Sequence, residues 1–584
     1  MTATAQRFFN LTSDEVSVDS MLPQFSYSVP LEGAFADSVY SSMILYPEFI
    51  DMTQEDIAHY HRLSADSLPA LPRVEQHLVL SRKKGSLEVS FCPLVYREGR
   101  YQILVSFMLR IDSKALPRAK RMAPGTRGTA EASRYADHSV LASGTWAKIR
   151  VPSTGVYQLT ESFIRQAGFS NLSKVKVYGY GGNLQNEKLV GDELRATDDL
   201  HEVPTYAAGN RRIFYARGPV SWANNTATRR TRNPYSDYGY YFLTETDAEP
   251  QRVDSAAFLS SFYPSPDDYH SLYEKDGYSW YPGGRNLFDP DPIHYGKSKE
   301  VVFNNRTGAT SGRLTVSVSA GSNSRATVFF NGKQVGELYV SLGSYDKGNS
   351  ATATYNLSGL TASDTVSVRC VLGDPIRLDY VSMAWDKPTP APSLAAQFAT
   401  PEYVYHITNQ DHHADAAADM IIIIPTSQKL LKQAQRLAAF HEQHDAMRVR
   451  IVPADELYNE FSSGTPDANA YRRYLKMLYD RAETDADMPR YLLLFGDCVW
   501  DNRMLTSECA NLNPDDYLLC FESENSFNEI KCFVDDGFFC LLDDGEGVDQ
   551  MRSDKLDMAV GRFPVTTEDD AKAMVDKTIS YVEN

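Results

Sequence analysis

The 584-residue sequence has few cysteines, no long apolar run and a deficit of positive charge. Seven cysteines are too few for a disulfide scaffold of this size. The cysteines from 498 to 540 match no paired zinc-binding spacing, so buried free thiols are expected. Every apolar run is shorter than the roughly 18 residues that a membrane helix needs, so membrane association would require a partner or a covalent lipid.

The net charge of −18 reflects 76 acidic residues against 58 lysines and arginines. A chain with this charge repels polyphosphate, which argues against nucleic acid as a partner. The sequence is 42% hydrophobic and 23% charged, which is typical of a folded protein with sizeable cores. Its length predicts several domains.

The amino terminus lacks the basic and apolar regions of a signal peptide. Ala3, Thr4 and Ala5 nevertheless resemble the small-residue tail of a cleaved signal peptide, which would indicate an exported protein. A chance run of small residues explains the same pattern, so both interpretations stay open.

The first half of the chain is predicted to be rich in β-structure. Residues 1–112 end in an alternating strand pattern, with Ile103, Val105, Phe107 and Leu109 on one face, and are expected to form a small β-rich domain. Residues 113–143 are rich in Pro, Gly, Lys and Arg without periodicity and are interpreted as a linker. Residues 144–298 are predicted to form an aromatic-rich β domain.

Residues 299–385 are predicted to form a β-sandwich. Apolar residues alternate there with Thr and Ser, and Asn331 with Gly332 provides the positive φ angles of a tight hairpin turn. Residues 386–398 contain three closely spaced prolines and are interpreted as a stiff linker.

The last block, residues 399–584, is predicted to be an α/β subdomain with a doubly wound, mostly parallel sheet. Continuous apolar runs alternate with amphipathic helices, as in parallel sheets covered on both faces. The expected strands are 420–424, 449–452, 491–495, 530–534 and 556–560. Thr465 before Pro466, and Thr567 with Asp570, are expected to begin two helices. Such sheets place their chemistry beyond the carboxyl ends of the strands, where acidic residues follow.

The motifs of this block resemble the first half of a gingipain-type cysteine peptidase domain. They are YLLLFGD (491–497), FVDDGF (533–538), LLDDG (541–545), DMAVGRFP (557–564) and KTISY (577–581). Four upstream segments are similar to a narrower branch, the signal peptidases and sortases of the type IX secretion system. They are VKVYGYGG (175–182), YSDYGYY (235–241), NEFSSGTPD (459–467) and AYRR (470–473).

The resemblance implies a caspase-like domain of two subdomains, in which a Cys thiolate attacks a peptide carbonyl and a His acts as acid and base. It implies an enzyme at the outer-membrane surface of a Gram-negative bacterium that removes carboxyl-terminal secretion signals. Its partners would be type IX cargo proteins, the outer-membrane shuttle protein of the same system and lipopolysaccharide, whose amine can receive the cargo through a thioester. The resemblance implies that no cofactor is required.

The family's catalytic His follows a Gly-His-Gly turn, and no His in this chain adjoins a Gly. We therefore expect the catalytic His and Cys beyond Asn584, so that this chain alone is inactive. The resemblance carries over one catalytic candidate. Asp557 occupies the place of a carboxylate that orients the catalytic imidazole, usually a Glu. A structural carboxylate at a sheet edge is the competing interpretation.

Further candidate sites come from single residues and clusters. Asp543, Asp544 and Glu546 are candidate calcium ligands, as calcium is bound by gingipain-type domains, although their spacing is not that of an EF-hand and a solvated acidic turn is the alternative. Cys498 could form a dyad with His441 or His444, but those histidines have solvated neighbours.

The adjacent His412 and His413 are a weak candidate for a metal site, against the alternative of a polar loop.

For the whole chain, the competing hypothesis is a non-catalytic surface binding module with a degenerate α/β scaffold. The sequence beyond Asn584 would distinguish this module from the enzyme.

Overall fold

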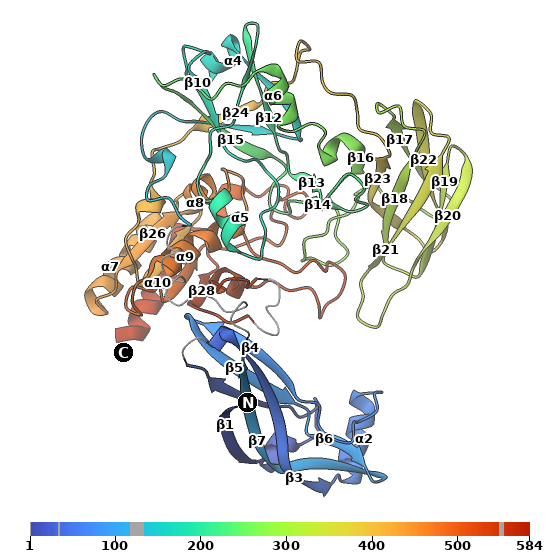
Figure 1. The fold of residues 1–584 in the computed structure, drawn as a ribbon, viewed down its shortest axis with the longest axis vertical. Helices are drawn as coiled ribbons and strands as arrows, with labels where there is room; N and C mark the ends of the chain where they lie inside the picture. The colour runs from blue at the N-terminus through green and yellow to red at the C-terminus, as the bar shows by residue number, and fades with distance from the viewer. Residues whose placement is uncertain (1, 33–34, 117–133, 548–553, 584) are drawn as a thin grey trace. The chain divides into compact units, whose positions relative to one another are not determined.

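The computed structural model describes residues 2–32, 35–116, 134–547 and 554–583 (Figure 1). The chain forms two compact units: a smaller unit, Met1–Ala130 with Asp543–Asp557, and a larger unit, Glu131–Leu542 with Met558–Asn584. None of the helices in the described ranges is long and apolar enough to cross a membrane. The predicted linker 113–143 lies largely outside the described residues, because 117–133 are not among them.

The smaller unit consists of two antiparallel sheets. One sheet is built around β7 (Arg100–Ala115), which pairs with β1 (Thr2–Asn10), β3 (Ser38–Asp51) and β6 (Leu94–Arg97). The other has the order β2 (Phe25–Pro30), β5 (Lys84–Phe91), β4 (Glu75–Ser81). Its helices α1 (Ser13–Val16) and α2 (Gln54–Leu63) begin at threonine capping boxes.

Two features of this unit bear on the sequence predictions. Phe107 and Leu109 of β7 pack in one core, whereas Ile103 packs in a second core, because the β3–β7 register shifts between Leu45 and Phe49. The small residues at positions 3–5, for which a signal-peptide tail and a chance run are both open interpretations, lie in β1, whose backbone pairs with β7.

The larger unit begins with the predicted aromatic-rich β domain. Its main sheet has the order β10 (Val175–Tyr178), β15 (Gly239–Glu245), β8 (Ala147–Val151), β24 (Glu402–His406). A second sheet contains β9 (Gly155–Thr160), β11 (Tyr206–Ala208) and β12 (Arg211–Ala216), and β13 (Val220–Trp222) pairs with β14 (Arg230–Arg232). The short helices are α4 (Glu161–Gln166), α5 (Gly191–Ala196) and α6 (Ser255–Ser260). The prediction placed β24 in the α/β block, but β24 pairs with β8 of this domain.

The next domain is the predicted β-sandwich. One sheet has the order β16 (His270–Glu274), β23 (Ile376–Trp385), β18 (Ser311–Ala320), β21 (Asn349–Ser358). The other has the order β17 (Ser298–Asn304), β22 (Ser363–Leu372), β19 (Ser324–Phe330), β20 (Lys333–Val340). Val316 and Val328, from opposite sheets, share one fully buried core. The predicted turn is present, with φ of 47° at Asn331 and 79° at Gly332.

The last domain is the predicted parallel α/β subdomain. Its strands, all parallel, have the order β26 (Val449–Pro453), β25 (Met420–Ile424), β27 (Tyr491–Phe495), β28 (Ala559–Phe563). Its helices are α7 (Leu431–His444), α8 (Ala454–Phe461), α9 (Asn469–Arg481) and α10 (Glu568–Glu583).

The alternation of side chains along β25 explains the two helical layers. Ile421 and Ile423 share a core with α8 and α9, whereas Ile422 and Ile424 share a core with α7 and α10. A strand that is apolar at every position is therefore buried on both faces. The fold predicted from the sequence, β-rich domains with a sandwich followed by a caspase-like α/β subdomain, is confirmed.

Three local predictions are wrong. Residues 530–534 form no strand and Ile530 is 68% exposed, because this segment lies outside the sheet. The strand predicted at 556–560 begins later, as β28. Thr465 does not cap a helix, since its hydroxyl accepts the N–H of Tyr240 and α9 begins only at Asn469. Thr567, by contrast, accepts the N–H of Asp570 as predicted.

Candidate functional site

An arginine whose side chain is only 10% exposed connects the chain segments at the carboxyl edge of the parallel sheet. The guanidinium of Arg562, in β28, donates to the carbonyl oxygens of Gly496 at 3.1 Å and Leu519 at 3.4 Å. It also forms two parallel hydrogen bonds, of 2.9 and 2.7 Å, with the carboxylate of Asp536. Burial alone would lower the pKa of Arg562, but Asp536 and Cys498 outweigh burial and raise it. Arg562 therefore stays protonated, and its charge is paired with the carboxylate of Asp536.

Two thiols lie beside this arginine. Cys498 follows β27 and is half-buried, and its N–H donates to Asp497 at 2.9 Å. Cys520 is fully buried, with its sulfur 3.5 Å from the carbonyl oxygen of Val499. A hydrogen bond with the Cys520 thiol lowers the pKa of Cys498, and Arg562 acts in the same direction against the effect of burial. Cys498 is therefore the more readily ionised thiol.

The possible dyad of Cys498 with His441 or His444 is not supported. Both imidazoles contact Asp445, at 2.6 and 2.8 Å, in the last turn of α7. α7 follows the carboxyl end of β25 and runs back toward the amino ends of the strands, because the next strand is parallel. The two histidines and Cys498 therefore belong to opposite edges of the sheet.

His412 and His413 are buried ionic residues rather than a metal site. The ring nitrogens of His412 lie 2.9 Å from Asp415 and 2.7 Å from Glu456. Those of His413 lie 2.7 Å from Glu460 and 3.3 Å from Asp198. Burial alone would lower the pKa of each ring, but the paired carboxylates raise both to about 10. Each ring nitrogen is already paired with a carboxylate, and among the described residues neither ring belongs to a cluster of possible metal ligands, so the metal interpretation is not supported.

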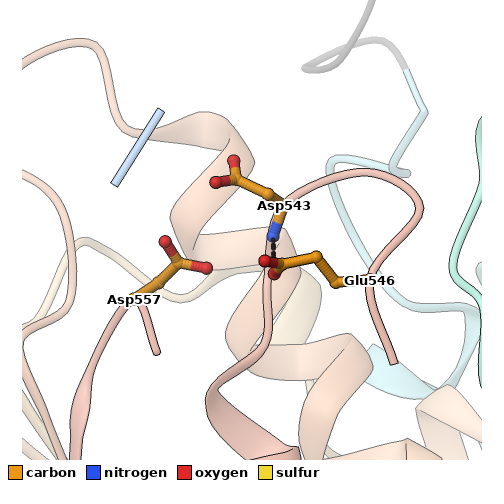
Figure 2. Close-up of side chains that lie close together, drawn as sticks. All are labelled: Asp543, Glu546 and Asp557. Carbon is orange, nitrogen blue, oxygen red and sulfur yellow. Dashed lines mark hydrogen bonds between the residues drawn. The ribbon is translucent and has the colours of Figure 1, made fainter. Parts of the chain in front are cut away.

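Three carboxylates do come together in the smaller unit. Oxygens of Asp543, Glu546 and Asp557 lie within 4.8 Å of one another, and all three residues are buried (Figure 2). Glu546 accepts the N–H of Asp543 at 3.0 Å, which holds the turn closed. Asp544, the other predicted calcium ligand, is exposed and does not belong to this group. Burial raises the pKa of Glu546 to about 8, and the charges of Asp557 and Asp543 act in the same direction.

Asp557, the candidate orienting residue, lies two positions before the start of β28 and is 2% exposed. Its carboxylate accepts the backbone N–H of Arg82, and its carbonyl oxygen accepts a hydrogen bond of 3.0 Å from the Arg82 guanidinium. Because it comes before the strand, it lies near the amino end of β28, whereas parallel sheets place their chemistry at the carboxyl ends. These contacts favour a structural role, and the catalytic role stays a prediction.

Sequence reasoning missed the residues that define the carboxyl edge. Arg562 could have been noticed in the sequence, because a charged residue within an otherwise apolar strand segment indicates a specific partner. No local signal pairs Cys498 with Cys520, because 21 intervening residues separate them and their contact depends on the fold.

Comparison with known proteins gives a family match and several structural likenesses. Residues 413–584 match peptidase family C25. The crystal structure of dimeric latent PorU from Porphyromonas gingivalis is similar over 78% of this chain, with 28% sequence identity and a TM-score of 0.64. The match covers 51% of the PorU chain, so the present chain spans about half of that length.

Other matches are weaker. A carbohydrate-binding module of family 36, in complex with calcium and xylotriose, covers 20% of this chain with 11% identity and a TM-score of 0.15. A family 35 module from an environmental isolate covers 21% with 17% identity and a TM-score of 0.17. Scores this low carry no argument about fold or function. Among curated protein sequences, none matches this chain.

Proposed function

We propose, from the premise that residues 413–584 belong to peptidase family C25, that this chain is the amino-terminal part of a cysteine endopeptidase and sortase. The observation that carries the proposal is the likeness to PorU, which extends over both the β domains and the α/β subdomain. In the proposed enzyme the catalytic Cys and His belong to the part of the protein beyond residue 584.

The proposed reaction proceeds through a thioester. The catalytic thiolate attacks the scissile carbonyl of a cargo protein, and the His protonates the departing amine of the carboxyl-terminal secretion signal. The acyl-enzyme then reacts with water, which releases the cargo, or with an amine on lipopolysaccharide, which anchors it. One intermediate therefore accounts for both products.

The sheet order is compatible with a domain in two halves. Within the described residues β28 pairs only with β27, so one edge of β28 is available for further pairing. Its residues are partly exposed, unlike the buried residues of β25. We propose that the second half of the peptidase domain adjoins this edge.

The proposed partners follow from the reaction. They are type IX cargo proteins, the outer-membrane shuttle protein of that system, and lipopolysaccharide as the amine donor. The proposed location is the outer-membrane surface of a Gram-negative bacterium, where cargo and lipopolysaccharide meet. The alternative is a non-catalytic surface binding module, which would bind cargo without cleaving it.

The proposal predicts that the full-length protein cleaves a cargo protein and that residues 1–584 alone do not, because the nucleophile and base are supplied by the second half. Cleavage is followed by mass spectrometry of the cargo, with and without an added amine. Full-length protein that binds cargo without cleaving it would support the binding module. Cleavage by residues 1–584 that survives Cys498→Ala would refute the assignment.

We also propose that Asp543, Glu546 and Asp557 bind calcium. Their oxygen ligands suit a hard cation, and their mutual burial makes three negative charges costly without one. Because of this cost, the pKa of Glu546 is raised, so its carboxylate binds a proton more readily than an exposed one does. Calcium would supply positive charge in place of that proton.

Calcium should stabilise the chain more at pH 9 than at pH 6. The pKa of Glu546 is raised from 4.5 to about 8, so without calcium its contribution to stability falls as pH rises through this range. Calcium at about 100 times its Kd should raise the thermal midpoint at pH 9 by roughly 5–10 °C. Scanning calorimetry provides the measurement, and Asp544→Asn is the matched control because Asp544 is exposed. An equal response at both pH values would contradict the site.

Asp557→Asn separates the structural role from the catalytic one. If Asp557 is a calcium ligand, the variant loses the calcium response, and turnover by the full-length protein stays within a few-fold of wild type. If Asp557 orients the catalytic His, turnover falls by about 10² to 10⁴-fold while the calcium response remains. The contact with the Arg82 N–H leads us to expect the first result.

A further inference from the structure

We propose that Cys498 and Cys520 form a redox-active thiol pair, which disulfide-containing small molecules oxidise to an intramolecular disulfide. The pair is independent of the proposed peptidase chemistry, since neither thiol is the expected catalytic nucleophile.

The backbone holds the two cysteines on adjacent segments. Cys498 and Leu518 form a parallel β-bridge, and the Leu518 N–H donates to the Asp497 carbonyl oxygen at 2.9 Å. Cys520 follows Leu518 by two residues. Asn502 fixes its position, because the Asn502 side chain accepts the Cys520 N–H at 3.0 Å and donates to the Cys520 carbonyl oxygen at 3.1 Å. The two sulfurs are therefore carried by segments with little freedom to separate.

Arg562 stabilises this arrangement. Its guanidinium donates to the carbonyl oxygen two residues before Cys498 and to the carbonyl oxygen directly before Cys520. It thus connects both cysteine-bearing segments and places a positive charge beside the thiols. A positive charge favours the thiolate, which is the attacking species in thiol–disulfide exchange. The acidic groups facing the pair are Asp497, Asp536 and Glu522; Asp536 is itself paired with Arg562.

The two thiols differ in accessibility in the way that an attacking and a resolving cysteine do. Cys498 is half-buried, whereas Cys520 is fully buried. A cavity of about 250 Å³ lies close to the pair, since Val499, next to Cys498, and Leu519, next to Cys520, are among its lining residues. We propose that a small disulfide reaches the partly exposed Cys498 first, and that the buried Cys520 then completes the reaction from within the protein.

The proposed thiol–disulfide exchange conserves atoms, electrons and protons. The Cys498 thiolate attacks one sulfur of the reagent RSSR, forming a mixed disulfide and releasing RS⁻. The released RS⁻ accepts the proton of Cys520, and the resulting Cys520 thiolate attacks the Cys498 sulfur and displaces the second RS⁻. The cysteines lose two electrons and two protons, and RSSR becomes two molecules of RSH.

Treatment of the purified chain with oxidised glutathione tests the pair. We expect the intact mass to fall by two hydrogens, and proteolysis before Asp515 to separate Cys509 from Cys520 and identify a Cys498–Cys520 cross-link. In the reduced chain, iodoacetamide should alkylate Cys498 about tenfold faster than Cys509. A stable glutathione adduct on wild-type Cys498, a cross-link to another cysteine, or no reaction would overturn the proposal.

Variants make the test specific. Cys520→Ser should retain one glutathione on Cys498, because the resolving thiol is absent, whereas Cys498→Ser should leave Cys520 unmodified. Cys509→Ser is the matched control and should form the same disulfide as wild type. Circular dichroism of each variant establishes that it is folded. A folded Cys520→Ser variant that still loses two hydrogens would show that Cys520 is not the partner.

Discussion

Glu460→Gln should lower the free energy of unfolding by about 3–5 kcal/mol, the cost of breaking a buried ion pair. Glu460 is fully buried, and its carboxylate lies 2.7 Å from the His413 ring and accepts the N–H groups of His412 and His413 at 2.9 and 3.1 Å. It also accepts a hydrogen bond from Gln410. Glutamine keeps the volume but removes the negative charge, which leaves the buried imidazolium of His413 with Asp198 as its remaining carboxylate.

Chemical denaturation measures the change, with Glu442→Gln as control. Glu442 is exposed on α7, so its replacement should alter stability by no more than about 0.5 kcal/mol. A Glu460→Gln variant as stable as this control would mean that the rings of His412 and His413 are neutral.

The same residues predict a pH dependence. On folding, the pKa values of His412 and His413 rise from 6.5 to about 10. The contribution of these two histidines to stability is therefore complete below pH 6.5 and is lost as pH rises through about 10. Wild-type stability should therefore decline across this range. The stability of the Glu460→Gln variant should decline less across this range, because without the Glu460 carboxylate the pKa of His413 is raised less on folding.

Arg562→Met should also cost about 3–5 kcal/mol, and it should slow the alkylation of Cys498. The change removes the two hydrogen bonds to Asp536 and those to the carbonyl oxygens of Gly496 and Leu519. Methionine fills much of the space, so the loss reports on charge and hydrogen bonding rather than on a cavity. Unfolding by urea and the rate of iodoacetamide labelling are the two measurements.

Arg436→Met is the matched control. Arg436 pairs with Asp576 across α7 and α10, but both side chains are more than 40% exposed. An exposed pair of this kind contributes at most about 1 kcal/mol. If Arg562→Met were as mild as Arg436→Met and left Cys498 equally reactive, Arg562 would be neither the anchor of this edge nor the activator of the thiol.

The sequence predicts the parallel sheet well because its strands are buried on both faces. β25 and β27 are apolar at nearly every position, which is favourable only for strands that are covered on both faces of the sheet. The prediction failed at 530–534, where a short apolar run has no strand to pair with. Apolar character alone does not distinguish a buried strand from a surface segment.

The candidate sites were harder to predict because they depend on contacts between distant segments. Asp543 and Glu546 were identified from one loop, but the third member of their group is Asp557 and not the neighbouring Asp544. Likewise, the buried charge of His413 requires Asp198, which lies more than 200 residues upstream in another domain. Local spacing carries no information about such partners.

The site of the acyl intermediate tests the proposed function most directly. Full-length protein is mixed with a cargo protein, quenched in acid and digested, and the cysteine that carries the cargo acyl group is identified by mass spectrometry. We expect a hydroxylamine-sensitive thioester on a cysteine beyond residue 584, with Cys498 unmodified. An acyl group on Cys498 or another cysteine of residues 1–584, or cleavage that persists after every thiol is alkylated, would contradict it.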